Sequence, residues 1–174
     1  MRDIIKEALE QQAEDGREVE RRRKNVIVYR VPESQTGNRE AMEKDDRSFI
    51  KDLMEGPLEI PHLSGTVKSI ISLGKKIEGS DGRPMLVQLA KVEDKEQFMQ
   101  CLKNLKTAED KFKKISVAHD LTPKQRESVK RMLTEAKKEQ EEKEKSAGSS
   151  QTGSWSFRVV DQMTTPRVIR VKVG

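Results

Sequence analysis

The sequence contains several short clusters of basic residues, and their composition and spacing suggest binding of phosphate groups. Lysine and arginine side chains bind phosphate groups, and together they displace the counterions of a nucleic acid. Each cluster could instead be a solvated surface balanced by carboxylates such as those of Glu20 and Glu127. Taken together, the clusters favour a nucleic-acid ligand. The clustered residues are Arg21, Arg22, Arg23 and Lys24; Lys75, Lys76 and Arg83; Lys111, Lys113 and Lys114; Arg126, Lys130 and Lys137; and Arg158, Arg167, Arg170 and Lys172.

Catalytic and metal-ligating groups are scarce. A nucleophile needs a base within reach, and a zinc site of the usual kind needs several Cys and His ligands. The chain has one cysteine and two histidines. We interpret His62 and His119 as surface or edge residues of different elements, and Cys101 as a core residue of a helix. We therefore predict a protein that is not an enzyme, with no catalytic residue, metal site or cofactor.

The composition excludes a membrane-spanning protein and a large enzyme with a single core. Of the 174 residues, 37% are charged and 33% are hydrophobic, and 35 Lys and Arg exceed 30 Asp and Glu to give a net charge of +5. The apolar runs are far shorter than the roughly 20 residues that a bilayer span needs. The single cysteine and the lack of a recognisable leader predict a reducing compartment, and the length predicts one or two small domains.

The N-terminal segment, residues 1–24, is expected to be helical. Ile5, Leu9 and Val19 are spaced as in a coiled-coil seam, and Gln12 and Gly16 occupy the positions between them. This pattern fits a short oligomerisation seam formed by Ile5, Leu9, Gln12 and Val19, and it fits a solvated helix equally well.

The middle of the chain alternates β-branched segments with helical periodicity. This order, β-α-β-β-α-β, predicts a ferredoxin-like sandwich of four antiparallel strands with two helices on one face. Alternation in the first strand places Tyr29 on the open face, where it could stack on a base, or else pack beneath the C-terminal segment. The expected strands are Asn25–Val31, Val67–Leu73, Met85–Ala90 and Ile115–Ala118, and the expected helices are Met42–Glu55 and Glu93–Lys106.

The C-terminal residues, 120–174, are expected to form a helix and a hairpin. Thr122 and Gln125 form a capping-box pattern around Pro123, which suits the first helical position. We expect the helix to fray over Lys138–Lys145 into a Ser/Gly linker at residues 146–154. The pattern of residues 156–160 and 167–173 then predicts two paired strands. The predicted fold class is therefore α+β.

Three motifs give the sequence a resemblance to the RNA-binding protein encoded by the first open reading frame of LINE-type (non-LTR) retrotransposons. They are Arg21–Ser34 (RRRKNVIVYRVPES), Gly82-Arg83-Pro84 ahead of the third strand, and Ile115–Arg126 (ISVAHDLTPKQR). Their order and spacing carry the likeness, which extends from about residue 18 to residue 172.

The resemblance implies the end of a trimeric coiled coil (1–24), an RRM-like domain (25–119) and a C-terminal domain (120–174) that closes on single-stranded RNA or DNA. It implies a homotrimer that coats its own transcript and acts as a nucleic-acid chaperone in a ribonucleoprotein of the cytoplasm, with the nucleus as a second location. The rival hypothesis is a coiled-coil adaptor whose RRM-like domain binds protein. The residues that match the basic positions of the family are Arg21, Arg22, Arg23, Lys24, Arg83, Lys113, Arg126, Lys130 and Arg131.

Overall fold

The computed structural model describes residues 2–34, 36–75, 82–146, 155–160 and 166–172. The fold is α+β, as predicted, and the chain divides into two compact units. We call residues Glu20–Asp120 the sheet unit, and Met1–Val19 together with Leu121–Gly174 the terminal unit. Helix α1 (Arg2–Arg22) begins in the terminal unit and ends in the sheet unit, which confirms the predicted N-terminal helix.

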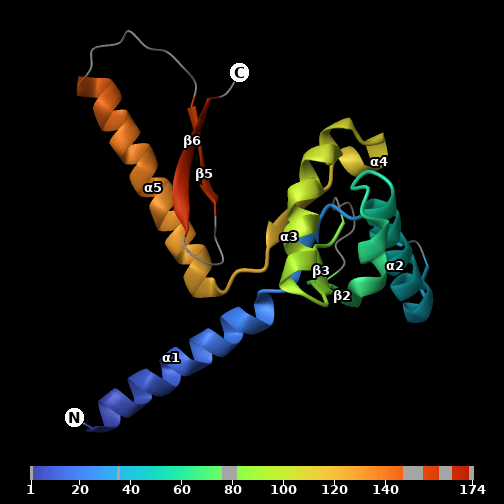
Figure 1. The fold of residues 1–174 in the computed structure, drawn as a ribbon, viewed down its shortest axis with the longest axis horizontal. Helices are drawn as coiled ribbons and strands as arrows, with labels where there is room; N and C mark the ends of the chain where they lie inside the picture. The colour runs from blue at the N-terminus through green and yellow to red at the C-terminus, as the bar shows by residue number, and fades with distance from the viewer. Residues whose placement is uncertain (1, 35, 76–81, 147–154, 161–165, 173–174) are drawn as a thin grey trace. The chain divides into compact units, whose positions relative to one another are not determined.

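The sheet unit, in which Figure 1 labels β2 and β3, contains a four-stranded antiparallel sheet. Its strand order is β2-β3-β1-β4. The order of the main helices and strands along the chain is the predicted one, and three short helices join it. The main elements are β1 (Asn25–Tyr29), α2 (Arg39–Glu55), β2 (Val67–Ser72), β3 (Met85–Leu89), α3 (Val92–Cys101) and β4 (Ser116–His119), and the short helices are η1 (Pro61–Thr66), η2 (Leu102–Thr107) and α4 (Asp110–Lys113).

One face of the sheet forms the core. Val26 and Val28 of β1 are fully buried in one cluster with Leu53 of α2 and Phe98 of α3. Because side chains alternate along a strand, Ile27 and Tyr29 point to the other face, as predicted. Tyr29 is half-buried there. Both helices therefore contribute to a core on one side of the sheet.

Three helix boundaries of the sheet unit differ from the predicted ones, and one of them is the start of α3, which lies one residue earlier at Val92. Helix α2 begins three residues earlier, at Arg39, because the Asn38 side chain caps it by accepting a hydrogen bond from the Glu40 N–H at 3.0 Å. Helix α3 ends at Cys101, and the last predicted helical residues form the 3-10 helix η2. Its first residue, Leu102, donates its N–H to the carbonyl of Met99, three residues back, which tightens the turn.

Strand boundaries also move by one or two residues. Strand β1 ends at Tyr29 because Arg30 has a φ of 62°, a left-handed conformation that cannot continue a strand. Strands β2 and β3 end at Ser72 and Leu89, one residue early, and β4 is shifted by one residue to Ser116–His119. The order of the strands was thus predicted correctly, whereas the strand ends depend on local backbone geometry.

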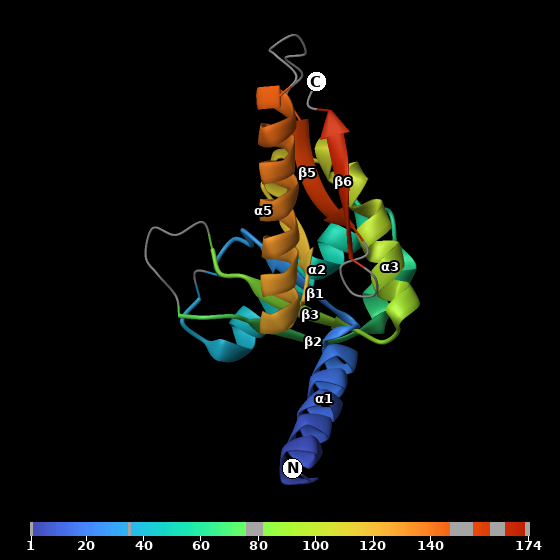
Figure 2. The same ribbon diagram turned by 90° about the vertical axis from the view of Figure 1, so that its left-hand side faces the viewer.

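The terminal unit consists of the N-terminal part of α1, helix α5 (Pro123–Ser146) and the hairpin of β5 (Trp155–Val160) and β6 (Arg167–Lys172). The hairpin is antiparallel, as predicted, and lies beside α5 in both views (Figures 1 and 2). The expected fraying of α5 is wrong, because the helix continues to Ser146 with ion pairs of the i,i+4 type such as Lys143–Glu139 at 3.9 Å. The predicted linker, residues 147–154, lies outside the described residues.

Few apolar side chains are buried in the terminal unit. Among its described residues, Leu121 and Val159 are the buried apolar ones. On α1, the seam residues Ile5 and Leu9 are 57% and 61% exposed. Within the described part of the chain, no helix is both long enough and apolar enough to cross a membrane.

Candidate nucleic-acid interface

The C-terminal end of α1 brings four basic residues to the edge of the sheet unit. Arg22 Nη1 donates to Asp120 Oδ1 at 2.9 Å, and Arg23 Nη1 lies 3.5 Å from Glu20 Oε2. Arg21 is exposed and Lys24 is half-buried, and within the described residues neither has a carboxylate partner. Arg21 and Lys24 are therefore the members of this cluster that are available for an external phosphate.

The strand order adds one basic residue that sequence reasoning missed. The Leu89 N–H donates to the carbonyl of Lys24 at 3.1 Å, so β3 ends beside the start of β1. The chain then turns into α3 through the exposed Lys91, whose backbone N–H donates to Asp94 at 3.2 Å. In the sequence, Lys91 stands alone, outside the basic clusters. Its position near Lys24 follows only from the pairing of β1 with β3. We call Arg21, Lys24 and Lys91 the junction cluster.

The predicted site residue Arg83 is tied to a carboxylate at the opposite end of the sheet. Its Nε and Nη2 donate to Glu33 at 2.7 and 3.3 Å, and its backbone N–H donates to the same side chain at 3.1 Å. The side chains of Arg83 and Glu33 are only 19% and 15% exposed. A bidentate, largely buried pair of this kind positions two loops, and it leaves the guanidinium little access to an external anion.

The basic residues that precede β4 or follow β2 divide into paired and unpaired ones. Lys113 Nζ lies 2.7 Å from Asp110, and Lys111 Nζ lies 3.8 Å from Asp52. Lys114 and Lys75 are exposed, and neither has a carboxylate partner among the described residues. The predicted site residue Lys76 lies outside the described residues.

Helix α5 carries the largest group of exposed basic residues. An open groove of about 760 Å³ follows it, and its described lining is Lys124, Glu127, Ser128, Lys130, Arg131, Thr134, Glu135 and Lys138. Arg131 Nε lies 3.8 Å from Glu135, and Lys124 Nζ lies 2.8 Å from Asp15 of α1. Arg126 and Lys130 are exposed without a carboxylate partner among the described residues, and they lie one helical turn apart.

The hairpin presents two arginines on one face. Arg158 pairs across the ladder with Ile169, and Arg167 pairs with Val160, so these four side chains share the face opposite the buried Val159. Arg158, Arg167 and Arg170 are all exposed, and Arg170 is on the same face as Val159 because it pairs with Phe157. Two of the three predicted hairpin arginines are therefore placed together by the register.

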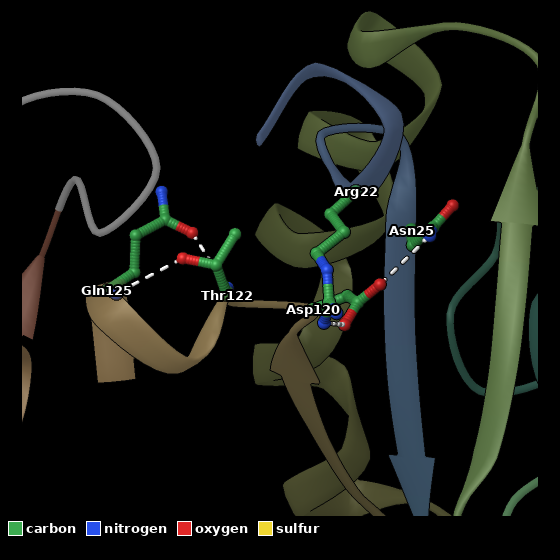
Figure 3. Close-up of polar contacts among 5 residues, drawn as sticks. All are labelled: Arg22, Asn25, Asp120, Thr122 and Gln125. Atoms are coloured by element: carbon green, nitrogen blue, oxygen red, sulfur yellow. Dashed lines mark hydrogen bonds and ion pairs between the residues drawn. The ribbon is translucent and has the colours of Figure 1, made fainter. Parts of the chain in front are cut away.

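Hydrogen bonds among Arg22, Asn25 and Asp120 join the two points where the chain enters and leaves the sheet unit (Figure 3). Asp120, which follows β4 and is 7% exposed, accepts from Arg22 through Oδ1 and from Asn25 Nδ2 through Oδ2 at 2.9 Å. In the terminal unit the predicted capping box is confirmed, because Thr122 Oγ1 accepts from the Gln125 N–H and Gln125 Oε1 accepts from the Thr122 N–H. The motif Asp-Leu-Thr-Pro thus supplies a structural anchor and a helix cap.

Two basic groups of the sheet unit have lowered pKa values: Lys95, which is buried, and His119, which is half-buried and directly precedes Asp120. Burial lowers the pKa of Lys95 on α3 to about 8, with the Asp120 charge acting in the opposite direction and Arg23 adding to the lowering. Burial also lowers the pKa of His119 on β4 to about 4, and the neighbouring Lys95 charge lowers it further. Sequence reasoning missed Lys95, although a lysine one turn before Phe98 on the apolar face of α3 was a visible signal.

The remaining candidates of conventional chemistry are separated. His62 is exposed in η1 and shares a hydrogen bond with Gln97 at 3.1 Å, whereas His119 lies in the edge strand β4. Cys101 is half-buried and packs against the core, as interpreted from the sequence. Among the described residues, no group of three or more His, Cys, Asp and Glu side chains could hold a metal ion.

Comparison of the chain with models of protein families and with curated proteins gave no match. The fold and the site define an α+β protein with exposed cations at both ends of a four-stranded sheet and along a separate basic helix.

Proposed function

We propose that this protein binds the phosphate backbone of single-stranded RNA and coats the RNA in a retrotransposon ribonucleoprotein. The observation that carries the proposal is a set of exposed cations without carboxylate partners among the described residues, which includes Arg21, Lys91, Lys75, Lys114, Arg126, Lys130 and Arg158. Unpaired surface cations bind a polyanion without first breaking an ion pair, and they release its counterions.

Reading of the phosphate backbone fits this surface better than reading of bases. Base-specific binding of single strands usually stacks bases on aromatic side chains of a sheet. Among the described side chains of the helix-free face, Tyr29 is the aromatic one, and it is half-buried beside Ser116 of β4. We therefore propose a sequence-tolerant interaction in which Tyr29 contributes at most one stacking platform.

The sheet unit supports the finer proposal of an RRM-like domain. Its β-α-β-β-α-β order and its strand order β2-β3-β1-β4 are compatible with a ferredoxin-like sandwich. The resemblance of three sequence motifs to the LINE-encoded RNA-binding proteins adds the chaperone activity, the homotrimer and the cytoplasmic and nuclear locations to the proposal.

The proposal is tested by titrating a labelled, unstructured oligonucleotide across a series of salt concentrations. We expect log Kd to rise linearly with log salt, and Arg126→Ala with Lys130→Ala to weaken binding about tenfold and to reduce the salt slope by about 0.7 for each phosphate that is no longer neutralised. A matched control is Arg39→Ala with Lys51→Ala, which removes the same charge from exposed residues of α2 that are paired with Glu43 and Glu55. Equal effects of both double variants would show a nonspecific effect of net charge.

Exposed apolar residues favour a second candidate, a protein-binding adaptor. Ile71 in β2 is 52% exposed on the sheet, and Ile5 and Leu9 are more exposed still. A folded oligomer that binds no oligonucleotide at low salt would exclude the RNA proposal and leave the adaptor.

A further inference from the structure

Arg30, the residue after β1, has a backbone conformation that arginine disfavours. Its φ of 62° lies in the left-handed region, where a residue with a side chain is strained and glycine is not. Arg30 is exposed, so packing of its side chain in the core does not compensate the strain. Strained residues of this kind cluster at binding and catalytic sites, where the side chain is needed for function. The presence of an arginine here therefore needs an explanation outside the core.

The side chain of Arg30 reaches the segment that leads into β4. Arg30 Nη1 donates to the carbonyl oxygen of Lys114 at 3.3 Å. This contact agrees with the strand register, because Lys114 lies two residues before Ser116, which pairs with Tyr29 of β1. Two basic residues that are 84 positions apart in the sequence, Arg30 and Lys114, thus lie side by side at one end of β1 and β4.

Neither of these two cations has a carboxylate partner among the described residues, and both are exposed. The Asp110 carboxylate of the preceding helix α4 is already paired, since it lies 2.7 Å from Lys113 Nζ. Arg30 and Lys114 are therefore adjacent like charges, which repel each other when no anion is present. An anion that binds both cations removes this repulsion.

We propose that Arg30 and Lys114 form a phosphate-binding site, which binds one backbone phosphate of the single-stranded RNA. The guanidinium of Arg30 has five N–H groups in a planar fork, and the bond to the Lys114 carbonyl uses one of them. The other N–H groups can bind two oxygens of one phosphate, and the flexible stem of Lys114 brings its ammonium to the same group. A glycine at position 30 would relax the backbone but would not bind the phosphate, which explains why the strain is retained. This inference rests on the proposed RNA-binding function and deepens it.

The substitution Arg30→Gly separates stability from binding. Because it removes the strain, we expect the midpoint of thermal unfolding to stay unchanged or to rise by up to about 4 °C. We expect the same variant to bind the labelled oligonucleotide about threefold more weakly, with a salt slope reduced by about 0.7, because one phosphate is no longer neutralised. An unchanged Kd and salt slope in a chain that binds RNA would overturn the proposal. A midpoint lowered by more than about 4 °C would overturn it as well, since Arg30 would then be required for the fold.

Two control variants separate the site from backbone flexibility and from net charge. Glu59→Gly introduces a glycine at a second exposed position with a left-handed backbone, where φ is 55°, and it should not weaken binding. Arg39→Ala removes one positive charge from an exposed residue that is paired with Glu43, and it should weaken binding less than Arg30→Gly does. If either control weakens binding as much as Arg30→Gly, the effect is not specific to the site and the proposal is overturned.

A titration with pyrophosphate tests the site without RNA. In the chain labelled with ¹⁵N-arginine, we expect pyrophosphate at low salt to shift the Arg30 Nε–H resonance until it saturates. Lys114→Ala should raise the apparent Kd of this shift by at least about threefold, because one of the two cations is lost. The control Lys103→Ala removes the same charge from an exposed lysine of η2 and should leave the Kd unchanged.

The two titrations distinguish the site from the function. The absence of a saturable shift, or equal Kd values for Lys114→Ala and the original chain, would overturn the phosphate site. If pyrophosphate binds as expected but the original chain binds no oligonucleotide, the proposed function fails, and Arg30 and Lys114 remain a site for a free phosphate compound.

Discussion

Burial changes the acid–base chemistry of Lys95 on α3. Its pKa of about 8 lies below the ordinary 10.5, so the folded chain binds fewer protons than the unfolded chain between these two values. Stability therefore rises as the pH rises from about 8 to 10.5. Below pH 8 both states carry the charge, and the folded state retains the full cost of burying an ammonium that has no hydrogen bond.

We predict that Lys95→Met raises the free energy of unfolding at pH 7 by about 1–3 kcal/mol, the usual cost of an unsatisfied buried polar group. The difference from the original chain should shrink as the pH rises through 8 to 10, because Lys95 then becomes neutral in the folded state. Urea unfolding at several pH values measures this difference. A matched control is Lys103→Met, an exposed lysine next to α3. A difference in unfolding free energy that stays constant between pH 7 and pH 10 would contradict the lowered pKa of Lys95.

At the scale of elements, the motifs behind the family resemblance hold loops together. The segment Val31–Glu33 lies against Gly82 and Arg83, because Glu33 binds Arg83 and a Cβ added at Gly82 would clash with the Val31 carbonyl oxygen. Arg22 and Asn25 meet Asp120 at the other end of the sheet. These motifs would therefore be required for the fold whether or not they touch RNA, and the unpaired cations are the better test of binding.

We predict that Gly82→Ala destabilises the chain by at least about 2 kcal/mol. Gly82 has a φ of 93°, and an added Cβ would lie 1.9 Å from the Val31 carbonyl oxygen, which is backbone and cannot move aside freely. The control Gly37→Ala places its Cβ in open space and is expected to change stability by less than about 0.5 kcal/mol. Chemical unfolding of both variants measures the contrast, and equal stabilities would refute the steric argument.

Sequence reasoning found most elements because their signals are local. The β-branched run around Val28 and the capping box of Thr122 and Gln125 need only neighbouring residues to be recognised, and both are confirmed. The pairing of Arg83 with Glu33 and the burial of Lys95 depend on residues that are distant in the sequence. Because charge looks the same whether it is solvated, paired or buried, the sequence indicated where cations gather but not which of them are available.

For the whole molecule, the net charge of +5 is less informative than its division between paired and unpaired groups. The basic residues with carboxylate partners, such as Arg83 and Lys113, stabilise loops and helix ends. The unpaired ones occur in both compact units, on the sheet unit at Lys114 and on the terminal unit at Lys130. A polyanion that binds both units has a higher affinity than either unit alone provides, since the second binding event is then intramolecular.

Self-association of the chain would further increase the affinity for a polyanion, because more binding units are then linked. We predict that the chains associate through α1. The exposed Ile5 and Leu9 lie four residues apart on one face of α1, as in a helical seam that lacks a partner. We expect light scattering of the original chain to give a multiple of its 19.9 kDa mass, three in the proposed trimer, and Ile5→Asn with Leu9→Asn to reduce it to one. The same variant should bind a long oligonucleotide at least about tenfold more weakly, because several linked chains no longer act together. The control Lys6→Ala with Glu10→Ala keeps the net charge and removes an exposed ion pair of the same helix, so it should retain both mass and affinity. If the original chain is monomeric, or if the variant at Ile5 and Leu9 has an unchanged mass, α1 is a solvated helix and not an oligomerisation seam. Binding would then depend on the cations of each single chain.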